Sequence, residues 1–537
     1  MRTPCDEAVL RSQEAVAQCT RKAAPWILTA TILGSSMAFI DSTVVNVALP
    51  VLQQSFHASV VDVQWVVESY GLFLGALILA GGALGDIFGR RKLFLIGVSI
   101  FAGASAWCGF AASIHQLILA RAVQGLGAAL LTPESLAIIS ASFDEKERGQ
   151  AIGTWSGFTA ITTAIGPVLG GWLIEHASWR WAFFLNVPIA AAVIVISLWR
   201  VPESRSPGAK GIDWLGAVLA TTGLGGIVFG LIESSTRGWG DFAVVMSLAV
   251  GVLSLIVFLF AETRVSSPMM PLSFFHSRAF SGANLLTLFL YAAIGIFFFV
   301  FPLNLIQIQK YSATKAGAAA LPLILCMFFL SRWSGGLVAR YGPRKPLVIG
   351  PLIVVAGFLL FMRSGVGGSY WKSFFPDFLV LGFGMAVTVA PLTTVVMNSV
   401  GADRAGAASG INNAVARIAG LLAIAVFGIV LVHSFGSRLE RDLSRVAVPQ
   451  EIKANLLANR VKLAAIDIPP QLGEGQANEI WHIVTGAFLF AFRRIMFLCA
   501  LLAAASSACA WISLSSSSAG SATTSQPKFA GSRDPKQ

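Results

Sequence analysis

The sequence predicts an all-α polytopic membrane protein that crosses the bilayer fourteen times. Hydrophobic residues make up 55% of its 537 residues and charged residues only 12%, and the mean hydropathy is +0.74. Soluble domains carry about 25% charged residues, so this chain has too few charges to cover a water-facing surface. Its apolar residues recur in windows of about 20, which is the length of a helix that crosses the hydrocarbon core.

The expected spans fall into groups of six, two and six. The spans are predicted at 26–50, 65–84, 93–112, 114–136, 150–174 and 181–200, then 213–233 and 241–261, then 280–302, 313–336, 346–363, 374–396, 411–432 and 489–513. The corresponding regions are a cytoplasmic N-terminal tail at 1–25, a six-helix bundle at 26–200, a cytoplasmic linker at 201–212, two additional central helices at 213–261, a second linker at 262–279, a C-terminal six-helix bundle at 280–513 that includes a long extracytoplasmic loop at 433–488, and a disordered cytoplasmic tail at 514–537.

The distribution of basic residues predicts the orientation. With an even number of spans, both termini lie on the same side of the membrane. If that side is the cytoplasm, the inner segments carry about 21 Lys and Arg residues and the short outer loops about 6, the bias expected of cytoplasmic loops. The net charge of +12 is explained in this way. No basic run with interleaved aromatic residues occurs, so nucleic acid is not an expected partner.

A short motif occurs twice. GGALGDIFGRRK follows the second span at 81–92, and GGLVARYGPRK follows the tenth at 335–345. The matched positions are Gly82, Leu84, Gly89, Arg91 and Lys92 with Gly335, Leu337, Gly342, Arg344 and Lys345. Both copies connect the second and third spans of a six-span bundle, so we expect two bundles of similar fold, as in many secondary transporters. Asp86 aligns with Ala339, so the second copy lacks the acid.

Asp41 and Arg121 are the first candidates for chemistry, because a charge within a span costs about 2.5–3.5 kcal/mol to insert. Asp41 lies about 22 Å along the first span, and Arg121 lies at a similar depth in the antiparallel fourth span. We expect both to face one cavity. There, a carboxylate that pairs with a guanidinium can exchange that partner for a proton, which would couple proton movement to transport. A static ion pair is the alternative.

Four more charged residues of the predicted spans are candidates for a functional role. Glu134, after Pro133, lies about 20 Å from Arg121 along the same span; it is a second proton site, a partner of the basic loop, or a solvated acid. Glu68 is near the outer end of the second span, where extension of the side chain to water is favoured over substrate contact. The same extension is the default for Arg332 and Arg417, with a gating role as the alternative.

The first copy of the repeated motif is predicted to form a latch, meaning contacts that form in one conformation and break in another. Its glycines suit a tight turn between two close helices. Asp86 can accept bonds from a helix N-terminus of the other bundle, and Arg90 and Arg91 can pair with Asp144 or Glu145. Simple inside-positive topology is the alternative. The predicted latch residues are Gly82, Asp86, Gly89, Arg90 and Arg91.

Two spans carry features that suit a moving cavity wall. The fifth span contains Gly166, Pro167, Gly170 and Gly171, which give a kink and a smooth face suited to a bundle interface that rocks; ordinary packing of small residues is the alternative. The ninth span carries Tyr291 and a run of phenylalanines that includes Phe298; these side chains either line a substrate cavity through their π faces or face lipid.

Other functional classes lack their signatures. There is no G-x-x-x-x-G-K-[ST] motif for ATP. The six histidines and six cysteines show no metal-ligand spacing. No Ser, His and Asp cluster shares one depth. We therefore expect neither an enzyme nor a metal or other cofactor.

The motifs together resemble the major facilitator superfamily, and within it the fourteen-span drug:proton antiporters of the EmrB/QacA type. The resemblance covers nearly the whole chain. The matching segments are MAFIDSTVVNVALP at 37–50, GGALGDIFGRRK at 81–92, RAVQGLGAA at 121–129, IGPVLGG at 165–171, SWRWAFFLNVP at 178–188, DWLG at 213–216 and SGINN at 409–413. One departure is Thr162, where the antiporter motif has its leading glycine.

The resemblance implies the major facilitator fold and proton-coupled export of amphiphilic drugs or toxic compounds by alternating access. It implies a coupling role for Asp41 and Arg121, a role in antiport for the fifth-span motif, and location in a bacterial cytoplasmic (inner) membrane. Some relatives work with a periplasmic adaptor protein, so an adaptor is a further expected partner beside lipid, substrate and protons. Two alternatives remain: a dedicated exporter of one metabolite or antibiotic, and an uncoupled channel-like or sensor protein.

Overall fold

The computed structural model describes residues 13–143, 145–205, 213–265, 268–400, 405–446, 448–468 and 472–514. Regular secondary structure within these ranges is entirely helical. Thirteen helices of the described residues are long and apolar enough to cross a membrane. The remaining predicted span, 150–174, lies within the 32-residue helix α6. The prediction of an all-α polytopic membrane protein is confirmed.

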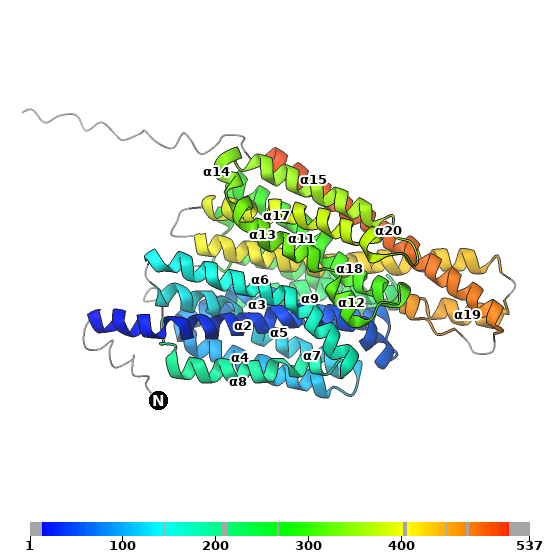
Figure 1. The fold of residues 1–537 in the computed structure, drawn as a ribbon, viewed down its shortest axis with the longest axis horizontal. Helices are drawn as coiled ribbons and strands as arrows, with labels where there is room; N and C mark the ends of the chain where they lie inside the picture. The colour runs from blue at the N-terminus through cyan, green and yellow to red at the C-terminus, as the bar shows by residue number, and fades with distance from the viewer. Residues whose placement is uncertain are drawn as a thin grey trace, which may run out of the picture.

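The first six spans form the N-terminal bundle (Figure 1, blue to cyan). Its helices are α2 (Gln13–Ser55), α3 (Val60–Phe88), α4 (Arg90–Phe110), α5 (Ile114–Ser142), α6 (Glu145–His176), and α7 (Trp181–Phe184) continued by α8 (Asn186–Arg200). Helix α5 packs against α3 and α4, and α2 packs against α6 and α8. A capping box, Ser59 with Asp62, begins α3.

Two additional helices follow, α9 (Trp214–Arg237) and α10 (Phe242–Glu262). They form an antiparallel pair, and α9 contacts both α3 and α18. Only 11% of the most apolar window of α10 is buried within the protein. Its continuously apolar surface therefore faces lipid, which explains why this window has the highest hydropathy of the thirteen spans.

The last six spans form the C-terminal bundle (Figure 1, green to red). Its elements are η1 (Leu272–His276), α11 (Arg278–Leu303), the π-helical turn η2 (Asn304–Ile308), α12 (Ala313–Ala318), α13 (Leu321–Gly335), α14 (Leu337–Tyr341), α15 (Arg344–Phe361), α16 (Tyr370–Ser373), α17 (Phe375–Asn398), α18 (Ala405–Leu443), α19 (Gln450–Ala458), η4 (Arg460–Ala465) and α20 (Glu474–Ser513). Phenylalanines of α11, α15 and α17 form its core, with ring centroids 5.0–6.0 Å from Phe297.

Three helices extend beyond the apolar windows that predicted them. Helix α2 begins at Gln13, α18 continues to Leu443, and α20 begins at Glu474. The predicted loop 433–488 is therefore largely helical, because hydropathy marks the part of a helix within lipid and not the point where its backbone hydrogen bonds end. Residues 1–12, 206–212 and 515–537, which include most of the predicted tails and linker, lie outside the described residues.

The two bundles meet along two equivalent seams. At one, α3 packs against α18; at the other, α6 packs against α12 and α13. Each seam joins the second span of one bundle to the fifth span of the other, as an approximate two-fold relation requires. Helix α9 covers the first seam, since it contacts both of its helices.

The turn between α3 and α4 is a single residue, Gly89, with φ of +112°. A Cβ at this position would lie 2.7 Å from a carboxylate oxygen of Glu203. The equivalent residue of the repeat, Gly342, also has a positive φ, of +75°. Both copies of the motif therefore use glycine to reverse the chain where other residues are strained.

We expect Gly89→Ala to lower the stability of the protein by about 1–2 kcal/mol, because alanine is strained at positive φ and its Cβ would displace Glu203. The midpoint of thermal unfolding in detergent measures the effect. Gly103→Ala in α4 is the matched control, since a Cβ there meets nothing within 4 Å. Equal midpoints for the two variants would contradict this account of the turn.

Candidate functional site

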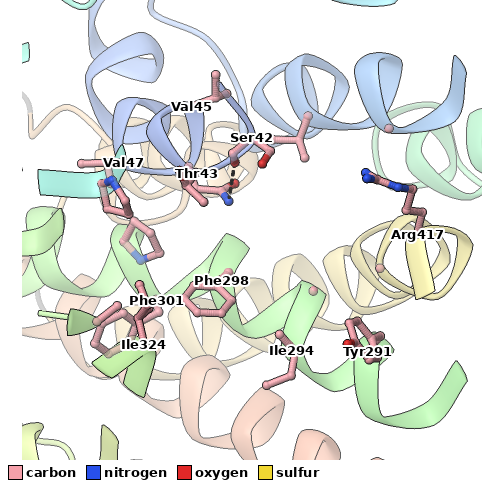
Figure 2. A pocket seen from close by; sticks show the side chains of 18 of the residues that line it. Ser42, Thr43, Val45, Val47, Tyr291, Ile294, Phe298, Phe301, Ile324 and Arg417 are labelled. Carbon is pink, nitrogen blue, oxygen red and sulfur yellow. Dashed lines mark hydrogen bonds between the residues drawn. The ribbon is translucent and has the colours of Figure 1, made fainter. Parts of the chain in front are cut away.

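A cavity of about 1550 Å³ lies between the two bundles. Residues of α2, α3, α5 and α6 line it from one side, and residues of α11, α12, α13, α17 and α18 line it from the other. Figure 2 shows Arg417 and Tyr291 at one end of the pocket and Phe298, Phe301 and Ile324 toward the other. The walls are mainly apolar and aromatic, and a few charged groups are set among them, which is typical of small-molecule sites.

Asp41 and Arg121 form a buried ion pair beside this cavity, as the sequence predicts. The Arg121 guanidinium donates to Asp41 Oδ2 at 2.5 Å, and the two side chains are 0% and 1% exposed. Arg121 lines the cavity while Asp41 lies behind it. Helix α2 brings Asp41 to this point, and α5 brings Arg121, at the common depth expected of antiparallel spans.

A network of hydrogen bonds surrounds the pair. Gln124 Nε2 donates to Asp41 Oδ1 at 2.8 Å, and its Oε1 accepts from Arg121 at 2.7 Å. Arg121 Nε also donates to the carbonyl of Val66 on α3, 3.1 Å away. Ser105 of α4 accepts from Gln124 at 3.3 Å and from Asn186 of α8 at 3.0 Å. One buried charge pair thus connects five helices of the N-terminal bundle.

Glycines of the same segment let the helices approach closely enough for these bonds. A Cβ at Gly125 would lie 2.5 Å from the carbonyl oxygen of Tyr70 on α3, and one at Gly127 would lie 2.5 Å from the amide of Phe101 on α4. The guanidinium carbon of Arg121 lies 4.2 Å from the ring centroid of Tyr70, a cation–π contact. The RAVQGLGAA segment therefore supplies both the charge and the close packing around it.

Glu68 corrects an expectation. It does not extend to water: it is 0% exposed, it lines the cavity, and neither carboxylate oxygen has a hydrogen-bond partner in the structure. The sequence placed it near the end of a span, but α3 begins eight residues earlier, at Val60, so Glu68 lies two turns inside the helix. A carboxyl in such a wall needs a proton or a cation to offset its burial.

The aromatic residues of α11 line the cavity. Tyr291, Phe298 and Phe301 are all part of its wall, as Figure 2 shows. The alternative, that Tyr291 and Phe298 face lipid, is wrong. The sequence could not decide this, because an aromatic residue in a span suits either environment.

Glu134 lies apart from the Asp41–Arg121 pair. Its carboxylate packs on Gly85 of α3, where a Cβ would lie only 2.1 Å from it, and both oxygens lack a hydrogen-bond partner in the structure. It is fully buried, so the solvated reading is wrong. Gly85 directly precedes Asp86 in the chain, so Glu134 lies against the first copy of the repeated motif.

The motif's charges make different contacts from those predicted. Asp86 pairs with Arg90 one turn along, at 2.7 Å, and does not cap a helix of the other bundle. The carboxylate of Glu203 instead accepts from the amides of Arg91 and Lys92 at 3.0 and 3.1 Å, at the N-terminus of α4, where the helix dipole favours an anion. Asp144 and the side chain of Glu145, the other predicted partners, lie outside the described part of the chain.

The fifth-span motif lies at the seam between the bundles. A Cβ at Gly166 or Gly170 would clash with Thr43 or Val44 of α2, at 2.3 and 2.5 Å. On the opposite side, a Cβ at Gly171 would lie 2.3 Å from the carbonyl oxygen of Ala313, and Gly317 would meet the carbonyl of Pro167. Helix α6 therefore packs closely against α2 on one side and against α12 on the other.

Sequence reasoning underestimated Arg417. Its side chain lines the cavity instead of extending to the membrane surface. Its position on the same helix face as Gly410 and Gly420 was a usable signal, because small residues at such spacing indicate a helix contact. Ser105 and Asn186 carried no comparable signal. The side chain of Arg332 lies outside the described ones.

A cavity between two related helix bundles, with a buried charge pair in its wall, defines a membrane transporter of the two-bundle class. The profile of the Major Facilitator Superfamily matches residues 31–424. The chain belongs to this superfamily, which confirms the predicted major facilitator fold, and it is a transporter and not an enzyme.

Curated relatives of this chain are named for drug resistance and export. The chain is 34% identical to the "Tetracenomycin C resistance and export protein" of Streptomyces glaucescens over 87% of each chain. It is 37% identical to the "Multidrug resistance protein Stp" of Mycobacterium tuberculosis over 80% of each. Among solved structures, a bacterial homolog of the human lysosomal transporter Spinster, in an inward-facing and unoccupied conformation, matches with a TM-score of 0.62 at 18% identity, covering 91% of this chain and 97% of the other; this likeness shows the fold alone.

We expect Asp41→Asn to destabilise the protein by about 3–5 kcal/mol, because it leaves the Arg121 charge buried and uncompensated. Asp41→Asn combined with Arg121→Gln should recover most of that loss. Unfolding midpoints of the two single variants and the double variant form the cycle that measures the coupling. Additive losses would show that the ion pair contributes nothing to folding.

Proposed function

We propose that this protein exports amphiphilic drugs or toxic compounds across a bacterial inner membrane in exchange for protons, by alternating access, with both termini in the cytoplasm. The observation that carries the proposal is the Asp41–Arg121 pair. Arg121 lies in the cavity wall and Asp41 directly behind it. Protonation of Asp41 would free Arg121 and loosen the network that joins five helices, and substrate entry would favour the reverse step. The names of the relatives, for drug resistance and export, support the outward direction.

The contacts between bundles support a rocking motion. Several hydrogen bonds join the bundles in the half of the molecule that carries α19. They are Gln53 with Lys462 and Gln307, Gln64 with Ile424, and Glu175 with Thr314. The first copy of the repeated motif lies at the opposite end, where it would act as a latch that limits the motion, with Glu134 beside it. We place the α19 end outside the cell, as the basic residues predict.

A dedicated exporter of one metabolite is the second candidate. The specific observation in its favour is the tetracenomycin relative, whose name gives a single compound. Expression in a drug-sensitive bacterium separates the two: resistance to chemically unrelated compounds supports broad export, and resistance to one class supports the dedicated exporter. An adaptor partner stays a prediction, to be tested by co-purification from native membranes.

Proteoliposomes with an imposed pH gradient and an interior pH dye test the coupling. We expect an exported compound to dissipate the gradient through the wild-type protein and not through Asp41→Asn, because that variant cannot exchange a proton. Asp41→Asn is compared at equal amounts of folded protein, because loss of the ion pair also lowers its stability, and Thr222→Val, which removes a hydroxyl bonded only to its own helix, is the control for a neutral substitution. Uphill transport by Asp41→Asn at the wild-type rate would remove Asp41 from the mechanism.

The seam of α6 and α12 provides a test of alternating access. Gly171→Ala should disfavour the conformation described here, because its Cβ meets the carbonyl of Ala313, which is backbone and cannot rotate away. Spin labels at the exposed positions His57 and Val366, in a cysteine-free background, report the separation of the bundles at this end. We expect the distance distribution to shift to longer values, with Gly103→Ala unchanged as control. Identical distributions would contradict closure by this seam.

A further inference from the structure

The central cavity contains a cation with no partner. The guanidinium of Arg417 reaches from α18 into the pocket (Figure 2), and among the described residues it forms no ion pair and no hydrogen bond. Arg121, the other arginine of the wall, is already engaged by Asp41, Gln124 and Val66. Arg417 is half-buried in the cavity wall, and a charge without a partner inside a membrane protein is costly and typical of a substrate or ion pathway.

Packing fixes where Arg417 lies. A Cβ at Gly75 of α3 would contact Arg417 Cβ at 3.7 Å, so glycine leaves room for the arginine stem. One turn further along α18, Gly420 meets Gly295 of α11, where a Cβ would lie 2.6 Å from the Gly420 Cα. Because α11 and α18 run in parallel, this crossing places Tyr291, one turn before Gly295, level with Arg417. Figure 2 shows these two side chains together at one end of the pocket.

The acid of the cavity lies elsewhere. Going along α3 from Gly75, Gly71 faces Leu421 of α18, and Gln64 donates to the carbonyl of Ile424 at 3.1 Å. Glu68 therefore lies about 10 Å from the level of Arg417, which corresponds to seven residues of helical rise. At that level α11 presents Phe298, one turn after Gly295. The pocket thus has a cationic end at Arg417 and Tyr291 and an aromatic end at Phe298, with a carboxyl beside it.

We propose that Arg417 binds the acidic group of the substrate, so that this transporter prefers aromatic amphiphiles that carry a carboxylate or an ionised phenol over purely cationic ones. An arginine pairs with a carboxylate through two parallel hydrogen bonds, and the apolar remainder of such a compound fits against Phe298 and Phe301. This inference rests on the proposed export function, because the bound compound is taken to be the exported substrate. The binding step itself requires no proton gradient.

Equilibrium dialysis with the full chain in lipid nanodiscs tests the proposal. The probes are 1-pyrenebutyrate, 1-pyrenebutanol and 1-pyrenebutyltrimethylammonium, which share one aromatic body and differ in charge, and empty nanodiscs of the same lipid correct for partition. We expect the wild-type protein to bind the carboxylate at least tenfold more tightly than the other two. Arg417→Gln should remove that preference and Arg417→Lys should retain part of it.

Arg494→Gln is the matched control, because Arg494 lies on α20 outside the cavity wall and bonds to Ser434. Equal affinity for the three probes, preference for the ammonium probe, or a carboxylate preference that survives Arg417→Gln would each overturn the proposal. If Arg417→Gln fails to fold, modification of wild-type Arg417 by phenylglyoxal decides: pyrenebutyrate should slow it and pyrenebutanol should not, and equal rates would refute the contact.

The outcome is separable from that of the proposed function. Charge-selective binding without proton-coupled transport would refute antiport and leave the Arg417 site in place. Coupled transport with no preference for the acidic probe would refute the site and leave antiport in place.

Discussion

The N-terminal bundle depends on one constraint: the Arg121 charge is buried at 1% exposure and must be paired. An ion pair placed out of water is stable only if further hydrogen bonds satisfy both groups. Gln124 bonds to both partners, Val66 supplies a carbonyl, and Ser105 continues the network to Asn186. A change of protonation at Asp41 would therefore be felt by five helices together, which is what a coupling site in a rocking bundle requires.

The two seams between the bundles are equivalent in topology but not in surroundings. Small residues make both possible, since Gly71 and Gly75 face α18 while Gly171 and Gly317 join α6 to α12. Helix α9 covers the α3–α18 seam, and the hydrogen bond from Trp65 to Glu233 attaches it to α3, while α10 packs on α9. The additional pair thus makes a two-fold architecture asymmetric, and the α6 seam is the one left uncovered by it.

The cavity joins these features. Its wall combines an engaged arginine, an unengaged arginine and an unpartnered carboxyl with a largely apolar aromatic lining. Charges at separate levels of one pocket allow a substrate and a proton to be bound at different places. Binding at one place can then alter the free energy of binding at the other. In an apolar wall, each such charge has a larger effect on binding than it would at a surface.

The sequence by itself determined the class of protein, the repeat and the pairing of Asp41 with Arg121, because hydropathy and the cost of a buried charge are properties of local composition and depth. It did not determine where helices begin and end, because backbone hydrogen bonds continue outside the apolar windows. Helix α18 continues beyond its window to Leu443, and α20 begins before its window, at Glu474. Nor did it determine which way side chains face. Glu68, Arg417 and Tyr291 were compatible with water or lipid until the crossings of α3, α11 and α18 turned them toward one cavity. Only the tertiary structure decided this, because the direction of a side chain around a helix has meaning only relative to the helices packed beside it.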